Sequence, residues 1–455
     1  MTQPDNHISK LAANSAPSIH PESILGDFLR NNDDVVFVRF QWQDYSGILR
    51  GRVVPVKQCL QLAAEGKLVQ VPPFAFECVL DNTLRPGMDP TGVDWLVPDW
   101  TSIRTSSRSS LPDGCYATVM CDVVRTTPAQ PGPNFDLCPR RALEKVIHKA
   151  RDTYRKDFLV GFEVEFEIMK VSGNGGFIPL SAGMGRFAIA GQRDPCFKYV
   201  EECIHELQVA GVSILTFQTE GRRGQYEISL GPLPPLQAVD QLVLVHDCIK
   251  SVVARHGHVA TMCPKPVQGR RQATGQHTHI SIHPPDREDS FLAGMLKRLR
   301  SLCAFGLPYD LSYERVQPYL GGEIVAWGTQ NREVAIRKIG PGHWEVRCID
   351  ATANMYLALA ALLSAGILGL GRQETLTWPD TAIPKQCLSG IGEEPCYLPR
   401  KLEVALDLLE AEISQVECMM GSRIARHYLA HKRFELSRTK EMDGDKARNL
   451  HIELF

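Results

Sequence analysis

Three glutamates alternate with apolar residues in the segment 161–168, which reads GFEVEFEI. Residues two apart in a β-strand share a face, so Glu163, Glu165 and Glu167 would point one way and the apolar residues the other. Carboxylates in a row repel one another unless a cation lies between them. The pattern predicts a strand that packs on a core and offers metal ligands. A solvated outer face of a sheet explains the same spacing equally well.

Two later segments add further groups that could bind metal. Glu220 and Glu227 bracket a glycine-containing turn, and carboxylate oxygens suit Mg²⁺ or Mn²⁺, which keep waters for phosphate oxygens. A charged hairpin tip is the alternative reading. In the segment 275–282, alternation places His277, His279 and Ser281 on one strand face. One histidine would more often be structural, but two on one face favour a functional site.

Arginines follow in two more segments. Arg332 and Arg337 lie in NREVAIR, and Glu345 and Arg347 share a face of the strand WEVR. Arginine binds phosphates and carboxylates through paired hydrogen bonds. Together the segments predict a divalent-metal nucleotide site, in which carboxylates hold metal and arginines neutralise developing charge. Neither a Walker A sequence nor a Rossmann fingerprint after a strand occurs, so ATP would bind by another architecture.

The composition fits an ordinary globular chain. The sequence has 455 residues, of which 44% are hydrophobic and 22% charged, with a net charge of −2. Without a basic excess, we expect neither nucleic acid nor an anionic membrane as a partner. The 14 cysteines are expected as reduced thiols in a cytoplasmic protein. The apolar run 357–370 is too short to span a bilayer and predicts a buried helix.

The order of expected elements suggests an α+β fold with two domains. The polar residues 1–21 are expected as a flexible tail and not a secretory signal. Short strands at 35–40, 48–54, 95–97 and 116–123 predict a β-rich domain over 22–125. The proline- and glycine-containing stretch 126–138 is the best linker candidate. A second domain, 139–455, would mix strands with helices, which we expect from 139 and at 194–209, 236–255, 351–368 and 400–426.

The motifs occur in an order that resembles the glutamine synthetase family. They are E-x-E, E-x6-E, TMCPKP, G-x-H-x-H-x-S, N-R-x4-R and E-x-R-x-x-D, and they run from Glu163 to Asp350. The resemblance extends over nearly the whole chain from about residue 22. It implies a β-grasp-like N-terminal domain and a catalytic domain with a curved antiparallel sheet flanked by helices. It also implies a ring-shaped homo-oligomer, a decamer or dodecamer, whose active sites are shared between neighbours.

The resemblance also implies roles, carried over position by position. It implies an ATP-dependent ligase that phosphorylates glutamate or a similar acid, after which an amine attacks the acyl phosphate. Two or three Mg²⁺ or Mn²⁺ ions are implied, one held by Glu165, Glu220 and Glu227, and the nucleotide-bridging one by Glu163, His277 and Glu345. The acid substrate would contact Arg315, Arg347, Gln272 and Gly275. The nucleotide would contact His279, Ser281 and Arg337, with Arg332 and Arg337 near the transferring phosphate.

Some positions depart from the family pattern at the end of the site that receives the amine. The family has a flap glutamate shortly after Pro318, where this chain reads Leu-Gly-Gly-Glu with one residue deleted, so Glu323 is a displaced catalytic candidate. The run 272–276 lacks the usual leading asparagine, and only Glu77 is a candidate for the family's ammonium-binding acid. These changes predict an amine other than ammonia, with room left by the flap glycines. Authentic glutamine synthesis and a non-catalytic assembly protein are the alternatives, and the six retained metal-ligand positions argue against the second.

Overall fold

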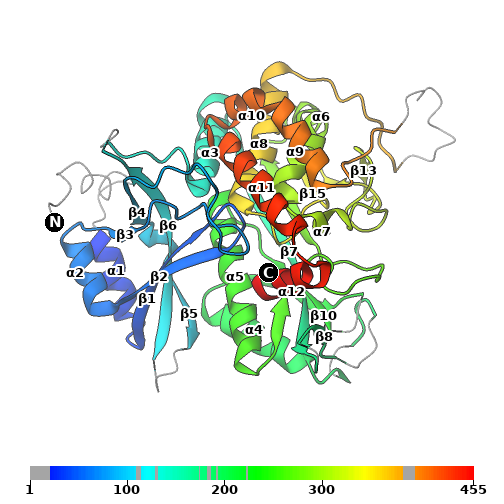
Figure 1. The fold of residues 1–455 in the computed structure, drawn as a ribbon. Coiled ribbons are helices and arrows are strands. Elements are labelled where there is room, and N and C mark those ends of the chain that lie inside the picture. Colours follow the sequence, from blue (N-terminus) through cyan, green and yellow to red (C-terminus); the bar gives the residue numbers. More distant parts are fainter. Residues whose placement is uncertain are drawn as a thin grey trace.

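Two β-sheets organise the chain, one in each half of the molecule (Figure 1). The computed structural model describes residues 21–108, 114–128, 132–173, 175–181, 186–190, 193–221, 224–382 and 395–455. The expected tail 1–21 lies almost wholly outside the described residues. The mixture of helices with sheets that are mostly antiparallel, with one parallel strand pair in each, confirms the predicted α+β class.

The N-terminal sheet has six strands in the order β2-β1-β6-β4-β3, with β5 paired to β6. The strands are β1 (Val35–Gln43), β2 (Leu49–Pro55), β3 (Val69–Val71), β4 (Val93–Pro98), β5 (Arg104–Arg108) and β6 (Cys115–Thr126). The predicted β1–β2 hairpin is confirmed. Alternation buries Val38 and Phe40 in the core, whereas Arg39 reaches Asp247 of the second half at 2.7 Å. One face of this sheet therefore lies against the rest of the molecule. Helices α1 (Pro21–Arg30) and α2 (Val56–Ala64) and the short 3-10 helix η1 (Trp100–Ser102) complete this half.

The second sheet has nine strands, seven of them in the order β13-β14-β15-β12-β7-β10-β9, with β8 and β11 also paired to β7. Its long central strand is β7 (Asp157–Val171). The others are β8 (Phe177–Pro179), β9 (Ile214–Thr219), β10 (Gln225–Leu230), β11 (Val259–Thr261), β12 (Gln276–His283), β13 (Trp327–Thr329), β14 (Ile336–Gly340) and β15 (His343–Val346). Gly224, with φ +72°, opens the return of the β9–β10 hairpin in a conformation that favours glycine.

Ten helices are described in the second half. They are α3 (Pro139–Tyr154), α4 (Phe197–Val209), α5 (Pro235–Arg255), α6 (Glu288–Gly306), α7 (Asp310–Tyr313), α8 (Met355–Arg372), α9 (Leu402–Ala411), α10 (Ile413–Met420), α11 (Ile424–Lys440) and α12 (Gly444–Leu454). The Asn354 side chain caps α8 by accepting a hydrogen bond from the Leu357 amide. Helix α8 is long and apolar enough to cross a membrane, but 83% of it is buried inside the molecule. The prediction of a buried helix here is confirmed.

Close backbone packing explains why α8 carries glycine among its apolar residues. A Cβ on Gly369 would lie 2.1 Å from the Ser290 carbonyl oxygen, and one on Gly294 would lie 2.3 Å from the Ala365 oxygen. Helices α6 and α8 therefore touch through their backbones. The expected helical region 400–426 is divided into α9, α10 and the start of α11. Gly421 adopts φ +62° and ends α10. The domain boundaries stay predictions.

Candidate active site

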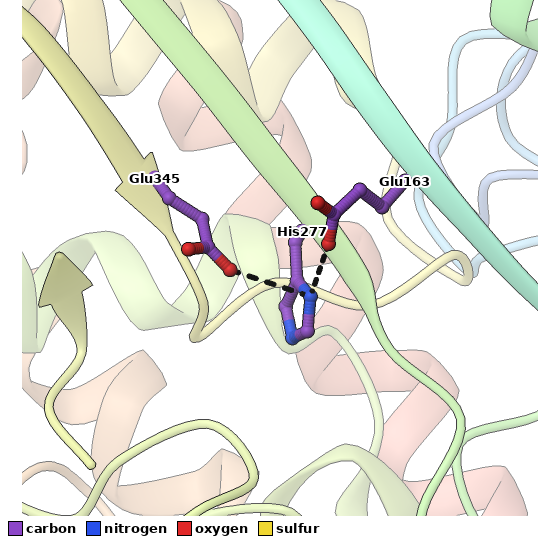
Figure 2. A group of neighbouring side chains, drawn as sticks. All are labelled: Glu163, His277 and Glu345. Carbon is purple, nitrogen blue, oxygen red and sulfur yellow. Dashed lines mark hydrogen bonds and ion pairs between the residues drawn. The ribbon is translucent and has the colours of Figure 1, made fainter. Parts of the chain in front are cut away.

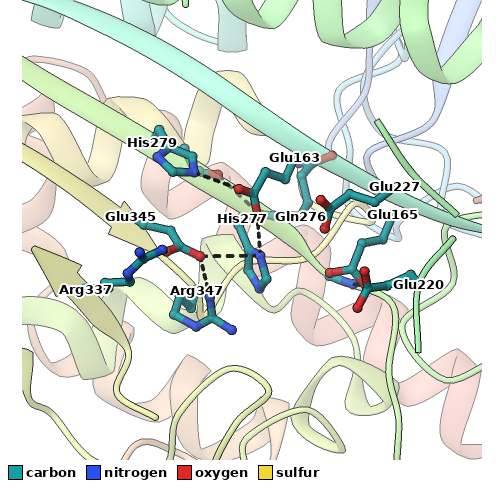
Figure 3. Close-up of polar contacts among 12 residues, drawn as sticks. Glu163, Glu165, Glu220, Glu227, Gln276, His277, His279, Arg337, Glu345 and Arg347 are labelled. Carbon is teal, nitrogen blue, oxygen red and sulfur yellow. Dashed lines mark hydrogen bonds and ion pairs between the residues drawn. The ribbon is translucent and has the colours of Figure 1, made fainter. Parts of the chain in front are cut away.

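Strand register brings the predicted acidic and imidazole side chains together on the second sheet. His277 of β12 lies opposite Glu163 of β7, and His279 lies opposite Glu345 of β15. On the other side of β7, Glu227 of β10 lies opposite Glu165. Facing residues on neighbouring strands are close enough to interact. The polar strand faces that alternation predicts are thus joined across β10, β7, β12 and β15 into one polar surface (Figure 3).

One cluster consists of Glu163, His277 and Glu345, whose ligand atoms all lie within 4.8 Å of one another (Figure 2). His277 Nδ1 is 2.9 Å from Glu163 Oε2 and 3.4 Å from Glu345 Oε1. Two carboxylates and an imidazole from three strands form a donor set that a divalent cation such as Mn²⁺ or Mg²⁺ accepts. The cluster is therefore a candidate metal centre.

Charge at this cluster is already balanced by neighbouring groups. Burial alone would raise the pKa of Glu163, but hydrogen bonds from His277 and His279 outweigh it and hold the pKa well below its usual range. Burial also opposes ionisation of Glu345, yet His277 and Arg347, with a hydrogen bond from Arg337, keep its pKa lowered. Both carboxylates are consequently ionised at neutral pH and available as ligands.

A second cluster has the opposite electrostatic character. Burial, and next the charge of Glu165, raise the pKa of Glu220 to about 7. Burial and the carboxylates of Glu163, Glu165 and Glu220 raise the pKa of Glu227 to about 9. The acids of this cluster repel one another without a compensating cation, which is what an assembled carboxylate site for a divalent ion should show. Strand register places Glu165 opposite Glu227, but among the described residues the ligand atoms of Glu165, Glu220 and Glu227 do not form a group within 4.8 Å of one another, so a second ion at these acids stays a prediction.

Both clusters open into a cavity of about 340 Å³. Besides the acids, its lining includes Arg315, Arg347, Arg332 and Gln272. Arg315 is fully buried and donates from Nη1 to the Ile349 carbonyl oxygen at 2.7 Å. The structure thus brings four of the residues implied to hold substrate or phosphate to the same cavity as the acids.

Gly275 lies next to both Glu165 and Arg315. Its amide donates to Glu165 Oε2 at 2.9 Å. A Cβ here would lie 2.5 Å from Arg315 Nη2 and 3.2 Å from Glu165 Oε1. A residue without a side chain therefore lets a carboxylate and a guanidinium approach each other closely.

The residues implied for the nucleotide lie next to the first cluster. His279 Nε2 is 3.2 Å from Glu163 Oε1, and its Nδ1 is 3.2 Å from His343 Nε2. Ser281 is opposite His343 in the β12–β15 pair. Arg337 Nη1 donates to Glu345 Oε2 at 2.8 Å. An imidazole and a guanidinium therefore border the candidate metal centre, and Ser281 lies two residues further along β12 from His279.

The flap, residues 319–323, differs from the sequence-based prediction of a displaced catalytic glutamate and of open space at the glycines. Glu323 forms an ion pair with Arg400 at 2.8 Å and does not line the cavity. The flap glycines do not leave room either: a Cβ on Gly321 would meet the Arg315 oxygen at 3.1 Å, and one on Gly322 the Ala335 nitrogen at 2.6 Å. The glycines instead let the backbone pack closely. The flap residues that do face the cavity are Tyr319 and Leu320.

Several cavity residues were not predicted. Gln225 Nε2 donates to Glu165 Oε2 at 3.0 Å, and Gln218 Nε2 donates to Glu227 Oε1 at 3.2 Å. Residues two apart in a strand share a face, so alternation from Glu227 and Glu220 could have identified Gln225 and Gln218. Alternation from Glu345 identifies His343 in the same way. Phe187 also lines the cavity, and no sequence pattern indicates it. Glu77, a candidate for ammonium, is buried and paired with Arg85 at 3.2 Å.

A mostly antiparallel sheet gathers carboxylates, imidazoles and arginines around one candidate metal centre. This set of side chains is typical of enzymes that use divalent ions to act on phosphate groups. Residues 136–448 match the family model described as glutamine synthetase, catalytic domain. The chain belongs to the glutamine synthetase family.

Two curated relatives show the range of that family. Protein fluG of Emericella nidulans is 31% identical over 449 residues, which cover 96% of this chain and 51% of fluG. The chain thus spans about half the length of that relative. Gamma-glutamylpolyamine synthetase GlnA3 of Streptomyces coelicolor is 30% identical over 376 residues, covering 75% of this chain and 76% of the relative. The family assignment agrees with the predicted class of ATP-dependent ligase.

Solved structures share the fold. A crystal structure titled as a novel glutamine synthase homolog superposes with a TM-score of 0.76 at 24% identity, covering 92% of this chain and 98% of that one. A GmaS/ADP complex gives a TM-score of 0.76 at 23% identity, covering 93% of this chain and 98% of that one. The predicted catalytic-domain architecture is confirmed.

Proposed function

We propose that the chain is an ATP- and Mg²⁺-dependent ligase that joins the γ-carboxylate of glutamate, or a similar acid, to a primary amine larger than ammonia. The observation that carries the choice of amine is the lining of the cavity by the flap. Tyr319 and Leu320 face the cavity, whereas Glu323 is paired with Arg400. The family name and the metal-ligand clusters support the ligase chemistry.

Each group of residues has a proposed task. Glu163, His277 and Glu345 would hold one ion, and Glu165, Glu220 and Glu227 another. When bound, the ions neutralise charge on the phosphoryl group that passes from ATP to the acid. Arg332 and Arg337 would stabilise the same charge from the protein side, with His279 and Ser281 toward the nucleotide.

The acid substrate needs its own positive partners. Arg315 and Arg347 are buried beside the cavity and present guanidinium groups that can donate to a carboxylate. Gly275 and Gln272 would shape the space next to them. Phosphorylation of the held γ-carboxylate would give γ-glutamyl phosphate, whose phosphate is displaced by the amine nitrogen.

Ammonia and a larger amine make different demands on the flap. Ammonium is small and charged, so holding and deprotonating it requires carboxylates close to the acyl phosphate. A larger amine gains binding free energy from apolar contact, about 0.8 kcal/mol per buried methylene. Tyr319, Leu320 and Phe187 would supply that contact. A relative named for γ-glutamylpolyamine synthesis supports an amine other than ammonia.

We also propose a ring of ten or twelve subunits in the cytoplasm. The family's shared active sites support assembly, and closed rings are a common result of head-to-tail contacts between identical subunits.

The decisive experiment measures ATP turnover with glutamate and Mg²⁺ across ammonia, aliphatic and aromatic monoamines, and polyamines. A higher kcat/KM for at least one larger amine than for ammonia is expected. If ammonia gives the highest value, the amine assignment is wrong. If no amine supports turnover by the assembled protein with Mg²⁺ present, the ligase proposal itself fails.

A further inference from the structure

The loop 262–275, which joins β11 to β12, supplies part of the active-site cavity. Gln272 and Ala273 line that cavity. At the end of the loop, the Gly275 amide donates to Glu165 Oε2 at 2.9 Å. The position of this loop therefore determines where several groups proposed for the acid substrate lie.

Hydrogen bonds within the loop join its two ends. The Lys265 ammonium is buried and donates to the carbonyl oxygens of Arg270 and Arg271 at 3.0 and 2.8 Å. The Thr274 amide donates to the Pro264 carbonyl oxygen at 3.0 Å. Because the two ends are tied together, a displacement at the start of the loop would be passed on to the end that faces the cavity.

Helix α12, red in Figure 1, holds the start of this loop from outside the cavity. Arg448 of α12 donates from Nη1 to the Lys265 carbonyl oxygen, and its Nη2 lies 3.4 Å from Glu314 Oε1. Glu314 directly precedes Arg315 in the sequence. Arg448 does not line the cavity itself. One guanidinium thus bridges the loop that ends at Gly275 and the segment that carries Arg315.

The spacing between these two segments is tight. A Cβ on Gly275 would lie 2.5 Å from Arg315 Nη2, so the loop and the guanidinium are already in close contact. Arginine carries its donors in a rigid planar fork and can therefore hold two partners at a set separation. A charged donor also makes a stronger hydrogen bond than a neutral one. Arg448 is consequently suited to fix the loop relative to Arg315.

Helix α12 has other attachments that do not involve Arg448. Ile452 is 1% exposed and belongs to a buried cluster that includes Cys263. The Met262 amide donates to the Phe455 carbonyl oxygen at 2.7 Å. Loss of the Arg448 side chain should therefore loosen the loop without releasing the helix.

We propose that Arg448 is a positioning residue for the acid substrate, and that it acts by fixing the loop 262–275 relative to Arg315. The proposal rests on the proposed function, because it takes the acid to be held beside Arg315 and Gly275. A contact that only stabilises the fold is the competing explanation. It would affect the acid and ATP alike.

Steady-state ADP release by the full chain with Arg448→Ala tests the proposal at saturating amine. We expect the KM for glutamate to rise about tenfold, because a loop that holds the acid in both ground and transition states contributes mainly to KM. The KM for ATP should change less than twofold. Lys446→Ala, at an exposed position of the same helix, is the matched control and should match wild type in both values. Thermal melting checks that each variant is folded.

Hydrogen exchange without substrates measures the same contact independently of activity. In Arg448→Ala the amides of 264–275 should exchange several-fold faster than in wild type, and those of α8 should not change. If wild type turns over with no amine, the proposed function fails, and exchange alone then decides whether Arg448 holds the loop.

Three results would overturn the proposal. They are an unchanged KM for glutamate in folded Arg448→Ala, equal rises in the KM values for glutamate and ATP, and unchanged exchange of the loop. If Arg448→Ala does not fold, Arg448→Lys decides by the same measurements, because lysine keeps the charge and lacks the fork.

Discussion

Adding one methyl group at Gly275 should strongly impair the enzyme without unfolding it. The new Cβ would lie 2.5 Å from Arg315 Nη2, whereas an ordinary contact begins at 3.4 Å, so one of the two groups must move by about 0.9 Å. Gly275 does not have a positive φ, so alanine is compatible with the backbone. Misplacing a substrate-positioning group by about 1 Å can reduce the rate about 10²-fold. We expect a loss of that order in kcat/KM for glutamate.

Steady-state ADP release, with glutamate varied at saturating ATP and amine, measures this loss. Gly173→Ala is the control, because nothing lies within 4 Å of a Cβ at that exposed turn. Both variants should melt close to wild type. Wild-type kcat/KM for glutamate in folded Gly275→Ala would refute the reasoning that Arg315 must stay in place to hold the acid.

Three further predictions concern metal, amine and assembly. Because the pKa values of Glu220 and Glu227 are raised to about 7 and about 9, both groups hold protons at low pH, and the metal-free protein loses stability as pH rises through those values. The increase in Tm produced by Mn²⁺ should therefore grow between about pH 6 and about pH 9; a constant increase would contradict this. Tyr319→Ala should raise the KM of an aromatic amine about tenfold, which corresponds to ~1.4 kcal/mol. The control Tyr397→Ala changes a similarly exposed tyrosine and should leave this KM unchanged. Equal effects of the two substitutions would show that Tyr319 does not contact the amine. Light scattering with Mg²⁺ present should give ten or twelve subunits, and a monomer would contradict the assembly proposal.

The acidic surface was predictable because alternation is a local property of strands. Glu163 and Glu165 could be assigned to one face from spacing alone, and so could His277 and His279. Which strand lies beside which is not local. The pairing of β7 with β12 on one side and β10 on the other decides that Glu163 meets His277 and Glu165 meets Glu227. Motif order could suggest this only through resemblance to a family.

The flap shows where sequence reasoning was insufficient. Gly321 and Gly322 suggested open space, but a glycine also occurs where another backbone approaches closely, and here that second cause applies. Glu323 offered a carboxylate, but Arg400, distant in the sequence, neutralises it. No local pattern brings such residues together.

The burial of α8 has a consequence for synthesis of the chain on the ribosome. A helix this apolar is a hazard while it is exposed, because it can aggregate or be mistaken for a membrane segment. Three of its packing partners, α3, α5 and α6, precede it in the sequence, and a fourth, α10, follows it. Helices α3, α5 and α6 have therefore left the ribosome before α8 emerges. Among them, α6 already carries Gly294, against which the backbone of α8 packs. Vectorial synthesis thus gives α8 a docking surface almost as soon as it appears.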